Sequence, residues 1–345
     1  MANTLLNIAK KEKNDEFYTS YKDIEDELQY YKEAFKDKVV YCNCDRPCVS
    51  EFWNYFEDNF NFLGLKKLVA TYFDQTKSVW KTEIIGSTED TRKILKTKVS
   101  GDGDFRSQEC TELLKEADIV VTNPPFSLFR EYVAQLIRYD KKFLIIGNLN
   151  AITYKEIFPL IKDNKVWLGY CGSGHTMHFA IKDNRIGEKF KSVTAVWYTN
   201  LDIQKRHEAL DLHKRYSSKE YPKYDNYDAI NINKVADIPK DYDGIMGVPI
   251  TFLEKHCPDQ FKIIGTISAP NDKDTLNLGK DYSKFVGYTQ DGETNGRTGA
   301  TFGKCPVIVM DDKKHPYYSD GNIRLQTVYH RIFIQKASKY EDRTT

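Results

Sequence analysis

The sequence lacks any hydrophobic run long enough to cross a membrane. Its longest apolar stretches are short, such as FLIIG, whereas a membrane-spanning helix needs about 20 apolar residues. The first residues, MANTLLNIAKKEKNDEFYTS, contain no apolar core of signal-peptide length. We therefore expect a cytoplasmic protein without a membrane partner.

An excess of charge of either sign is also missing. The chain has 51 lysines and arginines against 50 aspartates and glutamates, so its net charge is only +1. Such a chain is not a polycation. Any binding of nucleic acid would depend on a local basic face, which composition alone does not reveal.

Cysteines are few and lack the spacing of a common metal site. Seven cysteines are an odd number in a chain without secretory features, which argues against disulfides. Cys42, Cys44 and Cys48 are spaced C-x-C-x3-C, with no histidine nearby and no second CxxC pair. Three thiols could bind zinc, but we expect reduced core or loop cysteines and no metal ligand.

Helix-like and strand-like segments alternate over residues 21–165. Apolar residues at helical spacing predict a helix over residues 21–37, and buried strands are predicted at KVVYCNCD, LKKLVATYFD, ADIVVTNPPF and KKFLIIGN. Further helices are predicted at CVSEFWNYFEDNFNFLG, with Gly64 as its C-cap, at SLFREYVAQLIRYD, and at NAITYKEIFPLIKDN, which Pro159 interrupts. This order is typical of a parallel, doubly wound α/β sheet, in which ligands bind at the carboxyl ends of the strands.

After residue 205 the character of the sequence changes. The stretch HKRYSSKEYPKYDNYDAI is polar and rich in tyrosine, and we interpret its part RYSSKEYPKYDNYD either as a DNA contact or as a solvated linker. Short strand-like runs follow, with the glycine-rich stretch LGKDYSKFVGYTQDGETNGRTGATFGK among them. We predict two domains, an α/β domain over residues 1–205 and a smaller α+β or β-rich region over residues 206–345.

The sequence NPPF, from Asn123 to Phe126, directly follows a predicted buried strand. Two prolines stop the strand and fix the backbone direction. The amide oxygen of Asn123 and the carbonyl oxygen of Pro124 can accept hydrogen bonds from a planar exocyclic amine. Such an amine is a poor nucleophile because its lone pair is delocalised, and two fixed acceptors would stabilise the positive charge that develops when it attacks. A plain turn is the alternative interpretation of this short motif.

The Asn-Pro-Pro-aromatic signature in this setting resembles that of amino-methyltransferases that use S-adenosyl-L-methionine, chiefly DNA N6-adenine methyltransferases. The wider chain resembles the EcoRI-type adenine-specific methyltransferases. The resembling stretches are DEFYTSYKDIEDEL, KVVYCNCDRPCVSEFWNYF, LGLKKLVATYFD, GDGDFRSQE, ADIVVTNPPFSLFREYV, GIMGVPITFLEKHCPDQFKIIG and YHRIFIQ. The resemblance implies a Rossmann-like methyltransferase sheet in residues 1–205 that binds S-adenosyl-L-methionine, and a target-recognition region in residues 206–345.

The resemblance further implies that adenine N6 is methylated inside a short duplex sequence, after the base flips into an NPPF pocket. It assigns that pocket to Asn123, Pro124, Pro125 and Phe126, with Phe126 stacking on the base. It assigns cofactor contacts to the following residues: Phe17, Tyr18, Thr19, Asn43, Asp45, Asp74, Asp104 and Phe105. Most such enzymes have a glycine-rich turn where this chain has CNCDRP. Asp45 could instead cap a helix, Asp74 could be a solvated strand end, and GDGD could be a plain turn.

Double-stranded DNA is the expected partner, and the DNA-binding candidates lie in two glycine-rich stretches. They are His175 in GSGHTMHF, and Arg297 and Lys304 in TNGRTGATFGK, although either stretch could be a surface loop. We expect a monomer that belongs to a restriction–modification system or acts as a solitary methylase. A cognate restriction endonuclease encoded nearby would need no direct contact with it. The resemblance suggests a GAATTC-like palindrome, although the sequence does not determine the target.

Two alternative functions stay open at this point. Enzymes with an Asn-Pro-Pro-aromatic motif also methylate RNA adenines and a protein glutamine amide, because these substrates also present a planar nitrogen. The large C-terminal region favours duplex DNA over both. A non-catalytic DNA-binding relic of a methylase would explain the missing glycine turn, but the unbroken NPPF motif argues against it.

Overall fold

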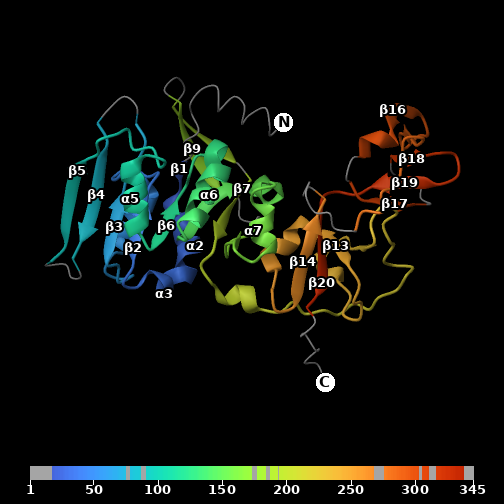
Figure 1. Cartoon of the computed structure of the whole chain (residues 1–345), viewed down its shortest axis with the longest axis horizontal. Coiled ribbons are helices and arrows are strands. Elements are labelled where there is room, and N and C mark those ends of the chain that lie inside the picture. Colours follow the sequence, from blue (N-terminus) through green and yellow to red (C-terminus); the bar gives the residue numbers. More distant parts are fainter. Residues whose placement is uncertain are drawn as a thin grey trace. The chain divides into compact units, whose positions relative to one another are not determined.

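The computed structural model describes residues 18–74, 78–86, 91–172, 177–183, 187–192, 194–267, 276–302, 305–310 and 316–337. The chain divides into two compact units. The first comprises Met1–Ile152 and Lys165–Ile203, and the second comprises Thr153–Asn164 and Gln204–Thr345. Both contain helices and sheets (Figure 1), so the mixed α/β class predicted from the sequence is confirmed.

The first unit is built on an eight-stranded sheet with the order β5-β4-β3-β2-β6-β7-β11-β8. Its strands are β2 (Val39–Cys42), β3 (Lys67–Ala70), β4 (Trp80–Ile85), β5 (Lys93–Lys98), β6 (Ile119–Thr122), β7 (Lys142–Asn148), β8 (Trp167–Leu168) and β11 (Ala195–Thr199). The four neighbours β3, β2, β6 and β7 pair in parallel. The remaining strands pair antiparallel with the strand beside them. The sheet is therefore mixed, where the sequence predicted a parallel one.

Helices connect and cover these strands. They are α2 (Tyr21–Leu28), η1 (Gln29–Tyr31), α3 (Lys32–Phe35), α4 (Glu51–Asp58), α5 (Gln108–Glu116), η2 (Phe126–Leu128), α6 (Phe129–Arg138) and η3 (Leu149–Thr153), where η marks a 3-10 helix. The single helix predicted over residues 21–37 is interrupted by η1. Helix α4 ends at Asp58, so Gly64 is not its C-cap. Gly64 instead adopts φ +62° in the turn before β3, a left-handed conformation that favours glycine.

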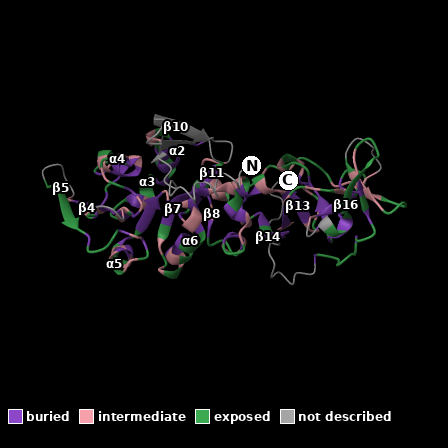
Figure 2. Cartoon of the chain, turned by 90° about the horizontal axis from the view of Figure 1, so that it is seen from above, coloured by how far each residue is buried: buried purple, intermediate pink, exposed green. Residues whose placement is uncertain are grey.

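Aromatic side chains build the core of the first unit. Phe52, Trp53 and Phe56 of α4 pack with strand residues such as Val40 and Leu68 in one buried cluster. The strands are largely buried except for β5, which is exposed along its length and appears green in Figure 2. The helix predicted at CVSEFWNYFEDNFNFLG therefore supplies aromatic side chains to the core, although it is shorter than expected.

A small antiparallel sheet in the first unit holds the segment that precedes α2. Its order is β1-β9-β10, with β1 (Tyr18–Thr19), β9 (His178–Asp183) and β10 (Gly187–Ser192). Thr19 pairs with Phe179. Ser20 then caps α2, because its Oγ accepts a hydrogen bond from the backbone nitrogen of Asp23. Thr19 and Ser20, which precede the first strand predicted from the sequence, are thus held by β1 and by the N-cap of α2.

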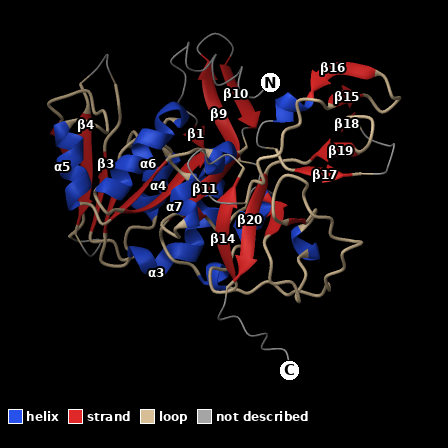
Figure 3. Ribbon diagram, turned by 45° about the vertical axis from the view of Figure 1, so that its right-hand side comes forward, coloured by secondary structure: helices blue, strands red, loops and turns tan. Residues whose placement is uncertain are grey.

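The second unit contains two further sheets (Figure 3). The first has the order β12-β13-β20-β14, with β12 (Ile230–Asn231), β13 (Met246–Pro249), β14 (Phe261–Thr266) and β20 (Arg331–Lys336). The second has the order β16-β15-β18-β19-β17, with β15 (Val286–Tyr288), β16 (Thr294–Thr298), β17 (Val307–Val309), β18 (Tyr317–Ser319) and β19 (Arg324–Thr327). Its helices are α7 (Phe158–Lys162), η4 (Gln204–His207), η5 (Val235–Asp237), η6 (Ile250–Lys255) and η7 (Gly299–Phe302).

The tyrosine-rich segment of the second unit is part of its core. Tyr221, Tyr224 and Tyr227 are buried, and Tyr224 and Tyr227 cluster with Phe333 of β20. The interpretation of these three side chains as a DNA contact or a solvated linker is therefore wrong. In the described part of the chain, no helix has the length and apolar character needed to cross a membrane.

Candidate active site

The NPPF motif stands where a buried parallel strand ends. Strand β6 stops at Thr122, and η2 begins at Phe126, where Leu128 N donates to the carbonyl oxygen of Pro125 at 3.0 Å. Pro124 is buried, whereas Asn123 and Pro125 are half-buried. Prolines cannot continue the ladder of hydrogen bonds, so the chain leaves the sheet here.

Asn123 is oriented by the strand that precedes α2. Its Nδ2 donates a hydrogen bond to Thr19 Oγ1 at 3.3 Å, and Thr19 is itself 5% exposed. The ring of Phe126 is 7% exposed and belongs to the main core cluster. Asn123 is thus held between β6 and β1, and Phe126 forms a fixed wall beside it.

Strands β2 and β6 are neighbours at the point where the connections of the sheet change direction. Val40 pairs with Ile119 and Tyr41 with Val120, both in parallel register. From β2 the chain continues to β3 on one side, and from β6 it continues to β7 on the other. Ligands bind in α/β sheets at such a switch point, beyond the carboxyl ends of the strands. The turns that begin at Asn43 and Asn123 meet at this edge.

Asp45 is a buried carboxyl group in the turn after β2. Its Oδ1 accepts a hydrogen bond from Ser50 Oγ at 2.6 Å, and its Oδ2 accepts one from Thr122 Oγ1 at 2.5 Å. Burial raises the pKa of Asp45 to about 6, although both hydroxyl groups favour its ionised form. The N-cap of α4 is Ser50. The alternative that Asp45 itself caps a helix is therefore wrong.

Asn43 supplies a buried polar group beside Asp45. Its Oδ1 accepts a hydrogen bond from the hydroxyl group of Tyr132 on α6, and its side chain is 2% exposed. Its buried Nδ2 has no hydrogen-bond partner among the residues that the structure describes. A buried donor left unpaired costs about 1–3 kcal/mol, which a ligand with an acceptor atom would recover. The glycine-free turn thus offers one donor and one carboxyl group.

The GDGDF loop packs against the end of β3. Asp74 N donates to the carbonyl oxygen of Asp102 at 2.9 Å. Gly103 has φ +77°, and a Cβ at this position would lie 2.0 Å from the carbonyl oxygen of Tyr72. Only glycine therefore permits this approach, which brings the loop beside Asp74.

Asp104 and Phe105 complete this part of the site. The guanidinium of Arg106 binds Asp104 through two hydrogen bonds of 2.9 and 2.6 Å and lowers the pKa of that carboxyl group. Phe105 is 5% exposed, and its ring lies 5.0 Å from that of Tyr132. Its carbonyl oxygen accepts from Gln135 Nε2 at 3.1 Å, while the buried Oε1 of Gln135 has no partner within the described ranges.

The predicted residues therefore fall into three groups. The first group is held by hydrogen bonds in the first unit. Thr19 bonds to Asn123, and Asp74 bonds to the GDGDF loop. Asp45 bonds to Thr122, the last residue of the strand before Asn123. Arg297 lies on β16 in the second unit and is exposed. Phe17, His175, Lys304 and the side chain of Tyr18 lie outside what the structure describes.

Several residues that shape the site were not predicted from the sequence. Thr122 could have been noticed, since it directly precedes NPPF. Tyr132 and Gln135 lie three positions apart on α6, a spacing that puts both on one helix face. Their partners, Asn43 and the backbone of Phe105, are far away in the sequence, and no local pattern indicates them.

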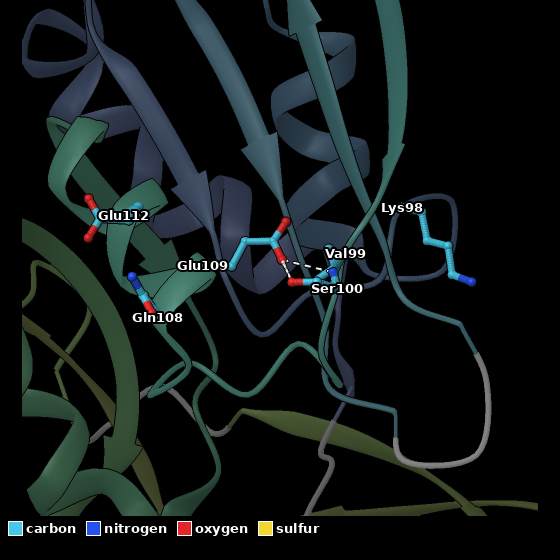
Figure 4. A pocket seen from close by; sticks show the side chains of 6 residues that line it. All are labelled: Lys98, Val99, Ser100, Gln108, Glu109 and Glu112. Carbon is cyan, nitrogen blue, oxygen red and sulfur yellow. Dashed lines mark hydrogen bonds between the residues drawn. The ribbon is translucent and has the colours of Figure 1, made fainter.

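A surface depression lies close to the GDGDF loop but contains none of the predicted site residues. It is lined by Lys98, Val99, Ser100, Gln108, Glu109 and Glu112 (Figure 4). The carboxylate of Glu109 accepts hydrogen bonds from Ser100 N at 2.8 Å and from Ser100 Oγ at 2.6 Å. These bonds tie the start of the loop to α5, and we assign the depression this structural role.

The cysteines near the site are free thiols. Cys42 is buried, Cys44 is half-buried and Cys48 is exposed. Burial raises the pKa of Cys42 and of Cys44, which keeps both thiols protonated. Within the described ranges, no group of three or more histidine, cysteine, aspartate or glutamate side chains could hold a metal ion.

Comparison with known proteins gives a match over nearly the whole chain. The family described as adenine-specific methyltransferase EcoRI matches residues 5–337. The Type II methyltransferase M.EcoRI of Escherichia coli is 51% identical over 305 residues, which cover 81% of this chain and 94% of that protein. The Type II methyltransferases M.MgeORF184P of Mycoplasma genitalium and M.MpnI of Mycoplasma pneumoniae are each 40% identical over 280 residues, or 76% of this chain and 86% of each relative.

Proposed function

The chain belongs to the adenine-specific methyltransferase EcoRI family, and from this membership we propose how its residues carry out the reaction. It is a Type II, site-specific DNA methyltransferase that acts on adenine in double-stranded DNA and serves restriction–modification. The membership removes the support for RNA or protein substrates and for a non-catalytic relic.

We propose S-adenosyl-L-methionine as the methyl donor, bound at the switch point between β2 and β6. When bound, it supplies an electrophilic methyl group on a sulfonium. The unpaired donor Asn43 Nδ2 suits a carboxylate, and the buried carboxyl group of Asp45 suits an ammonium group. These two groups would hold the methionine part, without the glycine-rich turn of other methyltransferases.

The nucleoside part of the cofactor would contact the adjoining loops. Asp74 at the end of β3 would bind the ribose hydroxyls, and Phe105 would contact the adenine ring. Because Arg106 already engages the carboxylate of Asp104, we assign Asp104 to fixing the loop. The segment Phe17–Thr19 would lie over the cofactor, as the contact between Thr19 and Asn123 suggests.

The catalytic group is Asn123, assisted by Pro124, Pro125 and Phe126. With Nδ2 donating to Thr19, the amide is turned so that its oxygen is the acceptor offered to the target amine. This oxygen and the Pro124 carbonyl would accept the two N–H groups of adenine N6, which stabilises the charge that develops as nitrogen attacks the methyl group. The prolines fix the carbonyl direction, and Phe126 would stack on the flipped base.

The second unit would recognise the target. We propose that residues 206–345 form the DNA-binding region, that Arg297, His175 and Lys304 contact the duplex, and that the first unit is a doubly wound Rossmann-like domain. Four parallel strands with a switch point support the last assignment. We further propose a monomer, a GAATTC-like palindromic target and a cognate endonuclease that needs no contact with this chain.

The observation that carries this proposal is NPPF beside the Asn43–Asp45 turn at the switch point, and Asn123→Ala tests it. Transfer of a labelled methyl group from S-adenosyl-L-methionine to duplex DNA should fall about 100-fold or more, because one of two fixed acceptors is lost. Cofactor affinity, measured by calorimetry, should stay close to that of the wild type.

Thr19→Val is the matched variant for this test. It removes only the hydroxyl that orients Asn123, so we expect a smaller loss of kcat than for Asn123→Ala. Methylation by Asn123→Ala near the wild-type rate would refute the catalytic assignment. Wild-type protein that binds the cofactor but leaves no N6-methyladenine in duplex DNA would refute the function.

A further inference from the structure

One face of the five-stranded sheet of the second unit packs against a core cluster, whereas the opposite face does so at β17, where Ile308 is buried in a second cluster. On the first face, Tyr318 of β18, Leu325 of β19 and Val307 of β17 cluster with the buried side chains of Phe285 and Phe302. Tyr318 pairs with Leu325, and Leu325 pairs with Val309, so these positions share one face of the sheet. The opposite face carries the alternate residues of each strand.

We call this opposite surface, on β15, β16, β18 and β19, the open face. The pairing register assigns to it Val286, Tyr288, Thr298, Tyr317, Ser319, Arg324 and Gln326. Each of these residues is exposed or half-buried. None is acidic, although the whole chain has nearly equal numbers of acidic and basic residues. The open face is therefore polar, aromatic and positively charged.

Two tyrosines and one arginine form an ordered group at its centre. The rings of Tyr288 and Tyr317 are stacked, with centroids 5.2 Å apart and planes 15° apart. The guanidinium carbon of Arg324 lies 4.7 Å from the centroid of the Tyr317 ring. Arg324 has no ion pair with any acidic residue that the structure describes. An aromatic ring therefore orients this cation, and no carboxylate of the described residues forms an ion pair with it.

Several acidic residues next to these strands in the sequence lie in the turns between them. Asp291 and Glu293 are in the exposed turn between β15 and β16. Asp320, between β18 and β19, accepts hydrogen bonds from Asn322 N at 2.9 Å and from Ile323 N at 3.1 Å, which hold its carboxylate within its own turn. Arg297 on the edge strand β16 is a further exposed cation of this sheet.

We propose that the open face binds the DNA duplex that carries the target adenine, with Arg324 as its anchor. The proposal rests on the function stated above. A guanidinium held over a ring presents a planar fork of donors, which suits bidentate contact with a guanine edge or a phosphate. The tyrosine hydroxyls, Ser319 and Gln326 add hydrogen-bonding groups. A protein partner fits less well, because Val286 is the only aliphatic side chain among the described residues assigned to the open face.

Arg324→Gln tests this proposal directly. Binding is measured by fluorescence anisotropy on a labelled duplex that contains the sequence methylated by the wild type. We expect the Kd for this duplex, and the KM for DNA in the methylation assay, to rise about tenfold or more. The kcat at saturating DNA and the affinity for S-adenosyl-L-methionine should not change, because Arg324 belongs to neither the NPPF motif nor the cofactor loops.

Two further variants control for charge and folding. Lys255→Gln removes one positive charge from an exposed residue at the end of η6 in the same unit, and it should leave Kd nearly unchanged. Arg324→Lys keeps the charge but loses the planar fork, so its Kd should lie between those of the wild type and Arg324→Gln. It also preserves the test if Arg324→Gln folds poorly.

The outcomes separate this inference from the proposed function. If Arg324→Gln and Arg324→Lys bind DNA as tightly as Lys255→Gln does, the open face does not bind the duplex. If the wild type methylates no duplex DNA, the proposed function itself fails. If the salt dependence of DNA binding shows that Arg324→Gln releases about one ion fewer than the wild type, Arg324 contacts a phosphate. If Arg324→Gln discriminates less between DNA sequences, Arg324 contacts a base. Either result supports the interface.

Discussion

Asp45 is the residue whose environment most directly affects cofactor binding. It is buried against Ser50 and Thr122, and burial raises its pKa to about 6. Most aspartates are ionised well below that pH. In the free protein, this carboxyl group therefore changes its charge close to the pH range in which the enzyme would be assayed.

We predict that affinity for S-adenosyl-L-methionine increases as pH rises to about 6 and is constant above it. A cationic ligand favours the ionised carboxylate, so below the pKa a proton must be released before the ligand binds. Each pH unit below 6 should weaken binding by up to about tenfold. Calorimetric titration measures the Kd of the cofactor between about pH 5 and 8, a range that extends from about one unit below the pKa to about two units above it. A Kd independent of pH across the range would contradict the assignment.

Asp45→Asn is the variant that separates binding from stability. In the folded protein the pKa of Asp45 is about 6, whereas the pKa of an ordinary aspartate is 3.8. The contribution of Asp45 to stability is thus fully present below pH 3.8 and is lost as pH rises to about 6. A neutral amide avoids this loss, which is about 3 kcal/mol at most. At pH 7 the variant should bind the cofactor more weakly although it is no less stable than the wild type.

Some of these residues could be found from the sequence and others could not. Asn123 was identifiable because NPPF is a local motif whose chemistry follows from adjacent atoms. Asn43 and Asp45 were assigned through family resemblance, since CNCDRP has none of the usual glycines. The partners of this turn, Thr122 and Tyr132, depend on how β6 and α6 pack, which no local pattern indicates.

At the scale of elements, the close contact between the GDGDF loop and the end of β3 depends on Gly103. A Cβ at Gly103 would meet the carbonyl oxygen of Tyr72 at 2.0 Å, and the φ of +77° is itself unfavourable for alanine. The backbone bond from Asp74 to Asp102 lies beside this contact. The loop can therefore keep its position only with glycine there.

We predict that Gly103→Ala weakens cofactor binding, because the loop that carries Asp104 and Phe105 must move away from Asp74. The cost of the strained backbone alone is about 1–2 kcal/mol, which corresponds to roughly a five- to thirtyfold higher Kd if binding restores the native loop. Calorimetric titration measures this Kd.

Gly101→Ala is the matched control for this substitution. It lies in the same loop, but a Cβ at Gly101 has no atom within 4 Å among the described residues, so its Kd should match that of the wild type. If both alanine variants bind equally well, the loop does not contribute to the cofactor site.

The predictability of elements followed their burial. Strands β2, β3, β6 and β7 are short apolar runs, and each was expected. The antiparallel strand β5, KILKTK, was missed because it is exposed along its length and shows no alternation of apolar and polar residues. The predicted helix over residues 48–64 ends at Asp58; beyond it, Phe60 packs into the core from a turn and Phe62 is exposed.

At the scale of the whole molecule, the chain carries one NPPF motif and thus one proposed catalytic centre. A palindromic duplex site contains a target adenine on each strand. A monomer with one centre can flip and methylate only one of these bases at a time. The second transfer must follow release or reorientation on the DNA.

We therefore predict that a single turnover on an unmethylated palindromic duplex yields hemimethylated DNA. With enzyme and duplex mixed at equal concentrations, strand-resolved detection of N6-methyladenine should show one methyl group per duplex before a second appears. Sedimentation at the assay concentration should give the mass of one 40.1 kDa chain. Simultaneous methylation of both strands by a dimeric species would contradict this expectation.

The same molecule should protect GAATTC sites in cells. The match to M.EcoRI has 51% identity and covers 94% of that protein. DNA from cells that express the wild type should resist cleavage by an endonuclease that cuts unmethylated GAATTC, whereas DNA from cells that express Asn123→Ala should be cut. Sequencing of N6-methyladenine across the genome gives the outcome without assuming a target. If methylation is abundant but falls at another sequence, the catalytic assignment stands and the proposed target is wrong, because the second unit would then read different bases.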